Sequence, residues 1–124
     1  MRMWQGVCGL SGSEGIVSPA YTILRPLPGT NAAFMCYLFK CPAMIAKFHS
    51  RSQGLVKDTL NLKFPAFSKI SVNLPDADIQ KHIVHVLEKA DEELNLTREY
   101  TESLRTQKRG LMQKLLTGEV RVAA

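Results

Sequence analysis

The sequence predicts an α+β protein: a first part with short strands and two short helices, then one long C-terminal helix of the coiled-coil type. Three observations support this. β-Branched and aromatic residues gather near residues 21–24 and 69–75. Residues 32–51 hold two compact apolar stretches that meet at Pro42. From Asp76 onward the apolar residues follow a helical period. We therefore divide the chain into residues 1–75, a helix over 76–118 and a tail over 119–124.

Residues 1–30 are predicted to form turns and short strands. Glycines recur through the start of the chain, which favours a loop or hairpin over a helix (Gly6, Gly9, Gly12 and Gly15). Residues 21–24 are expected to form a strand that ends before Pro26. The turn that follows leads to Asn31, which can cap a helix.

Two short helices are predicted next, over AAFMCYLFKC (32–41) and PAMIAKFHSRS (42–52). Proline is poorly tolerated inside a helix but suits its first turn, so Pro42 separates the two. In the second helix we expect Met44, Ile45 and Phe48 to face inward.

The stretch from Gly54 to Phe67 is predicted to be a loop, and KISVNLP (69–75) a last strand. Leu55, Leu60 and Leu62 are the expected apolar anchors of the loop. In the strand, the alternation of Ile70, Val72 and Leu74 predicts one buried face.

The long helix is predicted over residues 77–117. Pro75 marks its boundary, Asp76 and Asp78 suit its positive N-terminal end, and Gly118 suits its C-terminal stop. Forty residues of helix would span roughly 60 Å, which usually requires a partner helix.

A heptad register that starts at Leu87 places an apolar seam along this helix. We define the apolar seam by the candidate interface residues Leu87, Leu94, Leu104, Leu111 and Leu115. Thr97, Thr101 and Lys108 also fall on it, so its middle is polar. Polar seam positions cost stability but help to fix register and partner.

Charge divides the chain unevenly. Residues 1–75 carry eight Lys or Arg and two acids, a net charge of +6, whereas residues 76–124 carry a net charge of −1. The excess predicts an anionic partner, most commonly nucleic acid, although a basic solvated surface would look the same. No apolar run is long enough for a membrane span and no signal peptide is evident, so we expect a cytoplasmic protein without a membrane partner.

Residue types that carry chemistry do not form a catalytic constellation, and we expect neither a cofactor nor a metal. His82 and His85 lie three residues apart, but nothing at ligand spacing completes a metal site, so exposed or interface histidines are the simpler interpretation. Three cysteines, an odd number, argue against a closed disulfide framework and favour free thiols.

Basic and amide side chains are the remaining candidates. Lys and Arg can neutralise phosphates, and Gln, Asn and Arg can hydrogen-bond base edges. Each could equally be a solvated surface residue. The candidate DNA-binding residues are Arg2, Gln5, Lys47, Arg51, Lys57, Asn61 and Lys63.

Three stretches resemble the C-terminal portion of the specificity subunit of type I restriction–modification systems. RMWQG with GIVSPAYTILRP is similar to part of that family's target recognition domain, and GLVKDTLNLKFPAFSKISVNLP to its last segment. IQKHIVHVLEKADEEL with LRTQKRGLMQKLLTGEV is similar to its spacer helix. The family's second proline and the Glu before Gln80 are absent at the helix start. The chain is then expected to be a fragment with part of one recognition domain and one spacer helix.

The resemblance implies a non-catalytic, DNA-reading part of a multisubunit enzyme. Its implied partners are double-stranded DNA, the methyltransferase (modification) subunits and the restriction motor subunit. Spacer helices of the family pack antiparallel, and we expect a second copy to supply the missing one in a two-fold homodimer. The alternative is a truncated structural module that self-associates through its helix and does not bind DNA alone.

Overall fold

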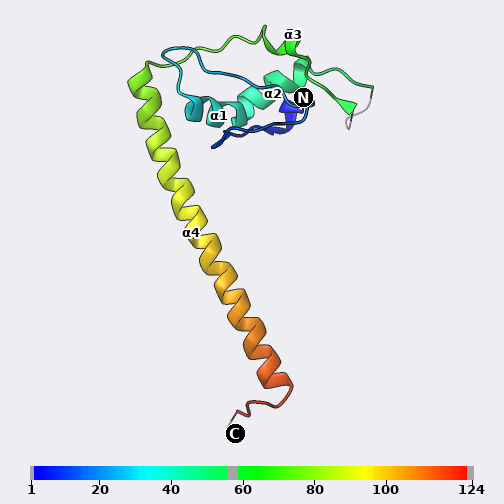
Figure 1. The fold of residues 1–124 in the computed structure, drawn as a ribbon, viewed down its shortest axis with the longest axis vertical. Coiled ribbons are helices and arrows are strands. Elements are labelled where there is room, and N and C mark those ends of the chain that lie inside the picture. The colour runs from blue at the N-terminus through cyan, green and yellow to red at the C-terminus, as the bar shows by residue number, and fades with distance from the viewer. Residues whose placement is uncertain (1, 56–58, 123–124) are drawn as a thin grey trace. The chain divides into compact units, whose positions relative to one another are not determined.

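A computed structural model describes residues 2–55 and 59–122 (Figure 1). A short 3₁₀ helix, η1 (Met3–Gln5), comes first. Within these residues four α-helices follow: α1 (Ala32–Lys40), α2 (Pro42–Arg51), α3 (Phe64–Phe67) and α4 (Ala77–Leu116). The chain divides into two compact units, Met1–Val84 and His85–Ala124. The first two turns of α4 therefore belong to the first unit.

The α+β prediction is wrong: the structure is mostly helical, with 57% of the described residues in helices and 2% in strand. Within the described residues, pairing of the β type is limited to one isolated antiparallel bridge between Gln53 and Asn61. The strands expected at 21–24 and 69–75 do not form. Side chains that suit a pleated surface make a strand only beside a second strand, and these segments have none in the described chain. η1 and α3 also occupy places where turns or loops were expected.

The alternation behind the last predicted strand still describes which side chains turn inward. Ile70 and Val72 pack against the hydrophobic core, whereas Ser71 and Asn73 are exposed. Leu74 is exposed at 38%. An extended chain alternates its side chains between two sides whether or not it is paired, so the predicted burial holds at Ile70 and Val72 but is wrong at Leu74.

The predicted helices are confirmed, and local signals set their ends. The Asn31 side chain accepts a hydrogen bond from the backbone N–H of Phe34 (3.0 Å), as a helix N-cap should. Pro42 occupies the first turn of α2. Helix α4 ends at Leu116, one residue before the predicted end, and Gly118 adopts the left-handed conformation (φ 73°).

One core cluster holds η1, α2 and the segment before α3 together. Its buried members are Met3, Trp4, Met44, Phe48 and Leu62. Met44 and Phe48 were predicted to face inward. Edge-to-face ring contacts extend the cluster from Phe48 to Phe39 of α1 (ring centroids 5.7 Å apart) and from Phe39 to Phe67 of α3 (5.9 Å). Leu55, expected to anchor the loop, is instead fully exposed.

The start of α4 is fixed by a buried side chain, Gln80 (1% exposed). Its Oε1 accepts a hydrogen bond from the backbone N–H of Asn31 (2.9 Å). Its Nε2 donates to the carbonyl oxygens of Gly29 (3.2 Å) and Pro75 (2.7 Å). One amide thus joins the turn before α1 to the segment that leads into α4.

Candidate nucleic-acid interface

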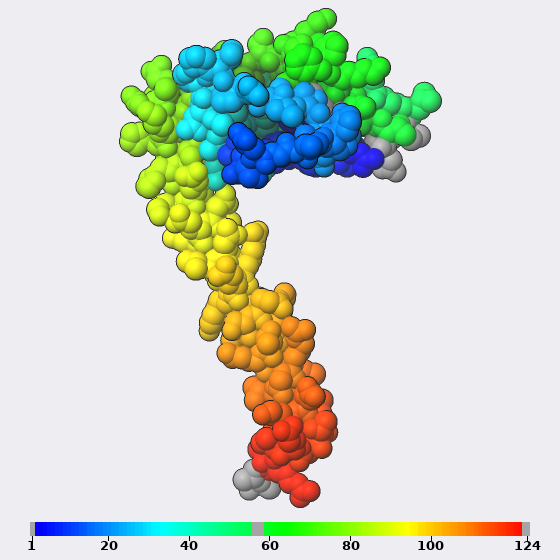
Figure 2. All heavy atoms as spheres, in the orientation of Figure 1, coloured from blue at the N-terminus to red at the C-terminus, as the bar shows by residue number. Residues whose placement is uncertain are grey.

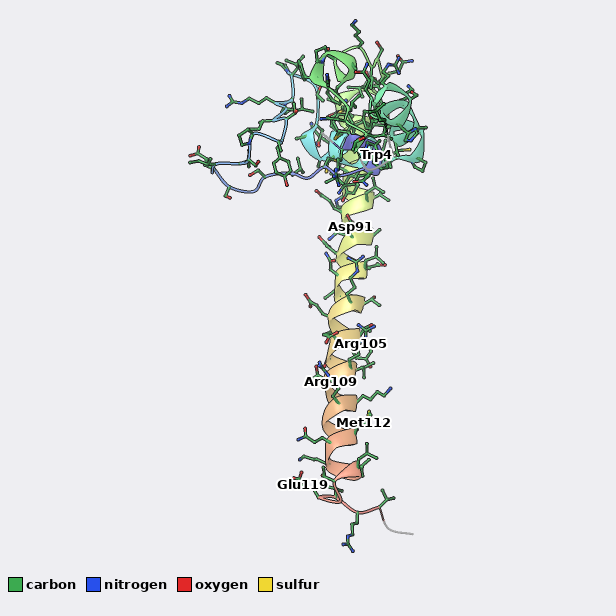
Figure 3. All side chains as sticks on the ribbon, turned by 90° about the vertical axis from the view of Figure 1, so that its right-hand side faces the viewer. Trp4, Asp91, Arg105, Arg109, Met112 and Glu119 are labelled. Atoms are coloured by element: carbon green, nitrogen blue, oxygen red, sulfur yellow. The ribbon has the colours of Figure 1, made fainter. Side chains whose placement is uncertain are left out.

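Helix η1 presents Arg2 and Gln5 at its two ends and buries the residues between them. Met3 and Trp4 are 6% and 9% exposed, whereas Arg2 and Gln5 are exposed. The indole Nε1 of Trp4 donates a hydrogen bond to the carbonyl oxygen of Leu60 (3.1 Å). Trp4, which is labelled in Figure 3, is therefore a buried anchor between the two candidates.

Helix α2 carries Lys47 and Arg51, both exposed and one helical turn apart. Between them, Phe48 is fully buried and His49 makes an edge-to-face contact with Trp4 (ring centroids 5.9 Å apart, planes at 76°). The contact holds the C-terminal half of α2 against η1. Both basic side chains consequently extend from a helix that the core keeps rigid.

The third segment places Asn61 and Lys63 on either side of Leu62, which is fully buried. The backbone of Asn61 exchanges two hydrogen bonds with that of Gln53 (3.0 and 2.9 Å). A Cβ on Gly54 would lie 2.8 Å from the carbonyl of Thr59, so the close return of the chain requires glycine there. Lys57, also a candidate, lies outside the described residues.

The structure thus attaches six of the seven candidates to three segments that share one core. Met3 and Trp4 come from the first, Phe48 from the second and Leu62 from the third. Basic residues dominate this unit, since residues 1–75 contain two acids against eight Lys or Arg. Such an arrangement can hold several cations and amide groups near one polyanion. The exposed candidates are Arg2, Gln5, Lys47, Arg51, Asn61 and Lys63.

Helix α4 presents the apolar seam to solvent over most of its length. Every described residue from Glu88 to Val122 is exposed, and in the space-filling view the part of α4 within this range is a single exposed helix (Figure 2). Leu94, Leu104, Leu111 and Leu115 are 42–60% exposed, whereas Leu87, nearest the first unit, is half-buried.

The two threonines in the polar middle of the apolar seam form hydrogen bonds with carbonyl oxygens of their own helix. Thr97 donates to the carbonyl oxygen of Glu93, and Thr101 donates to that of Thr97 (2.8 Å each). Both methyl groups stay available for packing. An open depression lies on the helix surface here. Its lining residues have the spacing of those that form the hole for a partner side chain in a coiled coil, and they are Leu94, Thr97, Arg98, Thr101, Glu102 and Arg105.

Charged side chains beside the apolar seam pair along the helix. Glu102 forms ion pairs with Arg105 (3.4 Å) and Arg109 (3.3 Å), and all three are mostly exposed. Figure 3 shows both arginines on α4. Exposed pairs of this kind contribute little to stability, but they fix where charge lies beside the seam.

Metal-ligating side chains do not cluster in the part of the chain that the structure describes: no three of them could hold one ion. The ring Nδ1 of His82 lies 2.9 Å from the carbonyl oxygen of Asp78, its own helix neighbour. Burial is the main cause that raises the pKa of Cys8 to about 11, and the thiol of Cys36 adds to the shift.

Sequence reasoning did not identify Trp4 as the side chain that supports the candidates, or Gln80 as the side chain that fixes the start of α4. Both act through partners about 50 residues away along the chain, Leu60 and Asn31 respectively. The single tryptophan of the chain was the one available signal for the first.

Comparison of the chain with protein-family models, with curated proteins and with solved structures finds no match. Across residues 2–55 and 59–122, none of the helices combines the length and apolar character that crossing a bilayer requires.

Proposed function

We propose that this chain is a DNA-recognition part of a type I restriction–modification specificity subunit, without chemistry of its own. The observation that carries the proposal is the set of exposed basic and amide side chains on three segments that share the Trp4 core. Phosphate contacts from Lys and Arg would supply affinity, and Gln5 and Asn61 could hydrogen-bond base edges. Helix α4 would act as the spacer and as the docking surface for modification subunits, and through them the restriction motor subunit.

Charge and rigidity together support this proposal over a merely basic surface. A net charge of +6 on residues 1–75 attracts any polyanion. Burial of Phe48 and Leu62 beside the candidates lowers the entropy lost when their neighbours engage a ligand. DNA is proposed as the polyanion because the chain resembles the specificity-subunit family over residues 2–6, 15–26, 54–75, 79–94 and 104–120.

The first prediction concerns salt-dependent DNA binding. Fluorescence anisotropy of a labelled duplex should show binding that weakens steeply with salt, because each neutralised phosphate releases a counterion. Replacing both Lys47 and Arg51 by Gln should lower the slope of log K against log salt by about 2, or about 1 per phosphate contact.

The matched control replaces Lys114 and Arg121 by Gln. Both are exposed and lie in the second unit, and the net charge falls equally. It should leave the salt slope unchanged. Equal effects from the two double variants would show that net charge alone attracts DNA. Absence of binding at low salt would refute the proposal for this chain.

A second candidate function is a self-associating interaction module built on α4. Its specific support is the apolar seam, exposed from Leu94 to Leu115, in a helix whose described residues after Leu87 are all exposed. A second copy, antiparallel and related by two-fold symmetry, would cover the seam. In this case the chain would dimerise but would not bind DNA at low salt.

A further inference from the structure

Two cysteines from segments far apart in the sequence lie against each other in the first unit. The thiol of Cys8 donates a hydrogen bond to the backbone carbonyl oxygen of Cys36, with 3.6 Å between sulfur and oxygen. Cys8 follows η1, whereas Cys36 lies in the middle of α1. Both are half-buried, and Cys8 packs against the hydrophobic core.

The two side chains also interact. After burial, repulsion by the Cys36 thiolate and a hydrogen bond with the Cys36 side chain are the next causes that raise the pKa of Cys8. The ammonium of Lys40, one turn further along α1, acts in the opposite direction and favours the Cys8 thiolate. The third cysteine, Cys41, is exposed at the junction of α1 and α2.

We propose that Cys8 and Cys36 form a thiol modification site, which a low-molecular-weight disulfide such as oxidised glutathione converts to an intramolecular disulfide. The Cys8 sulfur already lies 3.6 Å from the backbone oxygen of Cys36, so the fold brings the two residues to the short separation that a disulfide requires. The partners are 28 positions apart, so the fold, not proximity along the chain, selects them.

The reaction balances in two exchange steps. The Cys36 thiolate attacks one sulfur of oxidised glutathione, so that a mixed disulfide forms and one glutathione leaves as thiolate and takes up the proton. The Cys8 thiolate then attacks the Cys36 sulfur and the second glutathione leaves with the second proton. Two protein thiols are oxidised, and one glutathione disulfide is reduced to two thiols. Cys8 acts second because its raised pKa leaves little thiolate at neutral pH.

Formation of this bond would attach the irregular segment after η1 to α1. Between Val7 and Leu27 the exposed apolar side chains are numerous, Ile16 and Ile23 among them. Hydrogen bonds within this stretch are short-range turns, such as that from the N–H of Tyr21 to the carbonyl of Ser18 (3.0 Å). The disulfide would close the stretch into a loop and restrict it.

The experiment treats the full chain with oxidised glutathione under native conditions and in urea. Remaining thiols are alkylated, and non-reducing peptide mapping by mass spectrometry identifies the linked cysteines. Under native conditions Cys8 should be linked to Cys36, whereas the exposed Cys41 should stay free or carry glutathione and should not be linked to another cysteine. In urea the pairing should shift to Cys36–Cys41, because the shortest loop closes most easily in an unfolded chain.

Matched variants separate the pair from the exposed thiol. Cys41→Ser should form the same Cys8–Cys36 bond, whereas Cys8→Ser should stop at glutathione on Cys36. Circular dichroism would check that both variants keep the helical content of the native chain. Three results for the native chain would overturn the proposal. They are retention of all three thiols, a disulfide between Cys41 and another cysteine, and glutathione on Cys36 while Cys8 stays free.

Discussion

Gln80 shows how much one residue can determine locally. Its buried amide makes three hydrogen bonds, which hold the Gly29–Asn31 turn and Pro75 at the start of α4. Asn31 in turn caps α1. The side chain of Gln80 thereby sets the N-terminal ends of both α1 and α4, although Gln80 and Asn31 are 49 positions apart in the sequence.

Replacing Gln80 by Leu should destabilise the first unit by about 2–4 kcal/mol, because a similar volume is kept while an N–H and two carbonyl groups lose their partner. Urea unfolding followed by tryptophan fluorescence would measure the change, since Trp4 lies in this unit. Gln113→Leu, at an exposed position of α4, is the control and should change stability by less than about 0.5 kcal/mol. Equal effects from both would remove the argument for the buried amide.

Cys8 gives the first unit an alkaline limit. Its pKa in the fold is about 11 against an ordinary value of 9.0, mainly because burial disfavours the thiolate. Between these values the unfolded chain loses the proton first, so folding stability should decline as pH rises from 9 to 11 and be unaffected by this group below 9. Up to pH 9, the difference in the free energy of unfolding between the reduced native chain and the Cys8→Ser variant should therefore be constant. Above it, the native chain should lose stability relative to the variant, and a constant difference up to pH 11 would contradict this.

At the scale of elements, the apolar seam determines the expected association. Leu104→Asp with Leu111→Asp places two charges on the apolar seam and should weaken self-association at least about 100-fold, the effect of losing roughly 3 kcal/mol. Sedimentation equilibrium at tens of micromolar would show a dimer for the native chain and a monomer for the variant.

Leu96→Asp with Leu116→Asp is the control for this pair. It adds the same charges to the same helix at exposed positions off the seam, 65% and 81% exposed. This variant should remain dimeric. A native chain that is monomeric at these concentrations would refute self-association altogether.

Helices were predictable from the sequence because their signals are local. Asn31, Pro42 and Gly118 act on their own turns, and the observed bounds of α1, α2 and α4 lie within one residue of those predicted, whereas the short helices η1 and α3 were not predicted. Strands were not predictable in the same way. A strand needs a neighbour, and β-branched residues near Tyr21 or Ile70 indicate only that the chain would suit one.

At the scale of the whole molecule, the division of charge and the long helix could be read from the sequence. The sequence did not reveal which candidates are supported by the same hydrophobic core. Trp4 connects η1 to Leu60 and His49 through contacts that span 45 residues or more, and no local pattern encodes such contacts. Arg2 and Lys63 could therefore be named as candidates from their residue type alone. Only the fold shows that their segments pack on the same core.

The exposure of α4 has a kinetic consequence. A helix whose described residues after Leu87 are all exposed has only its own hydrogen bonds to keep its amides closed, and short openings cost little free energy. Its amide hydrogens should exchange with deuterium rapidly in a lone chain, whereas the amides of α1 and α2 should exchange slowly. Whatever covers the apolar seam would slow exchange from Leu94 to Leu115, so the pattern of slowed amides would trace the partner's footprint residue by residue.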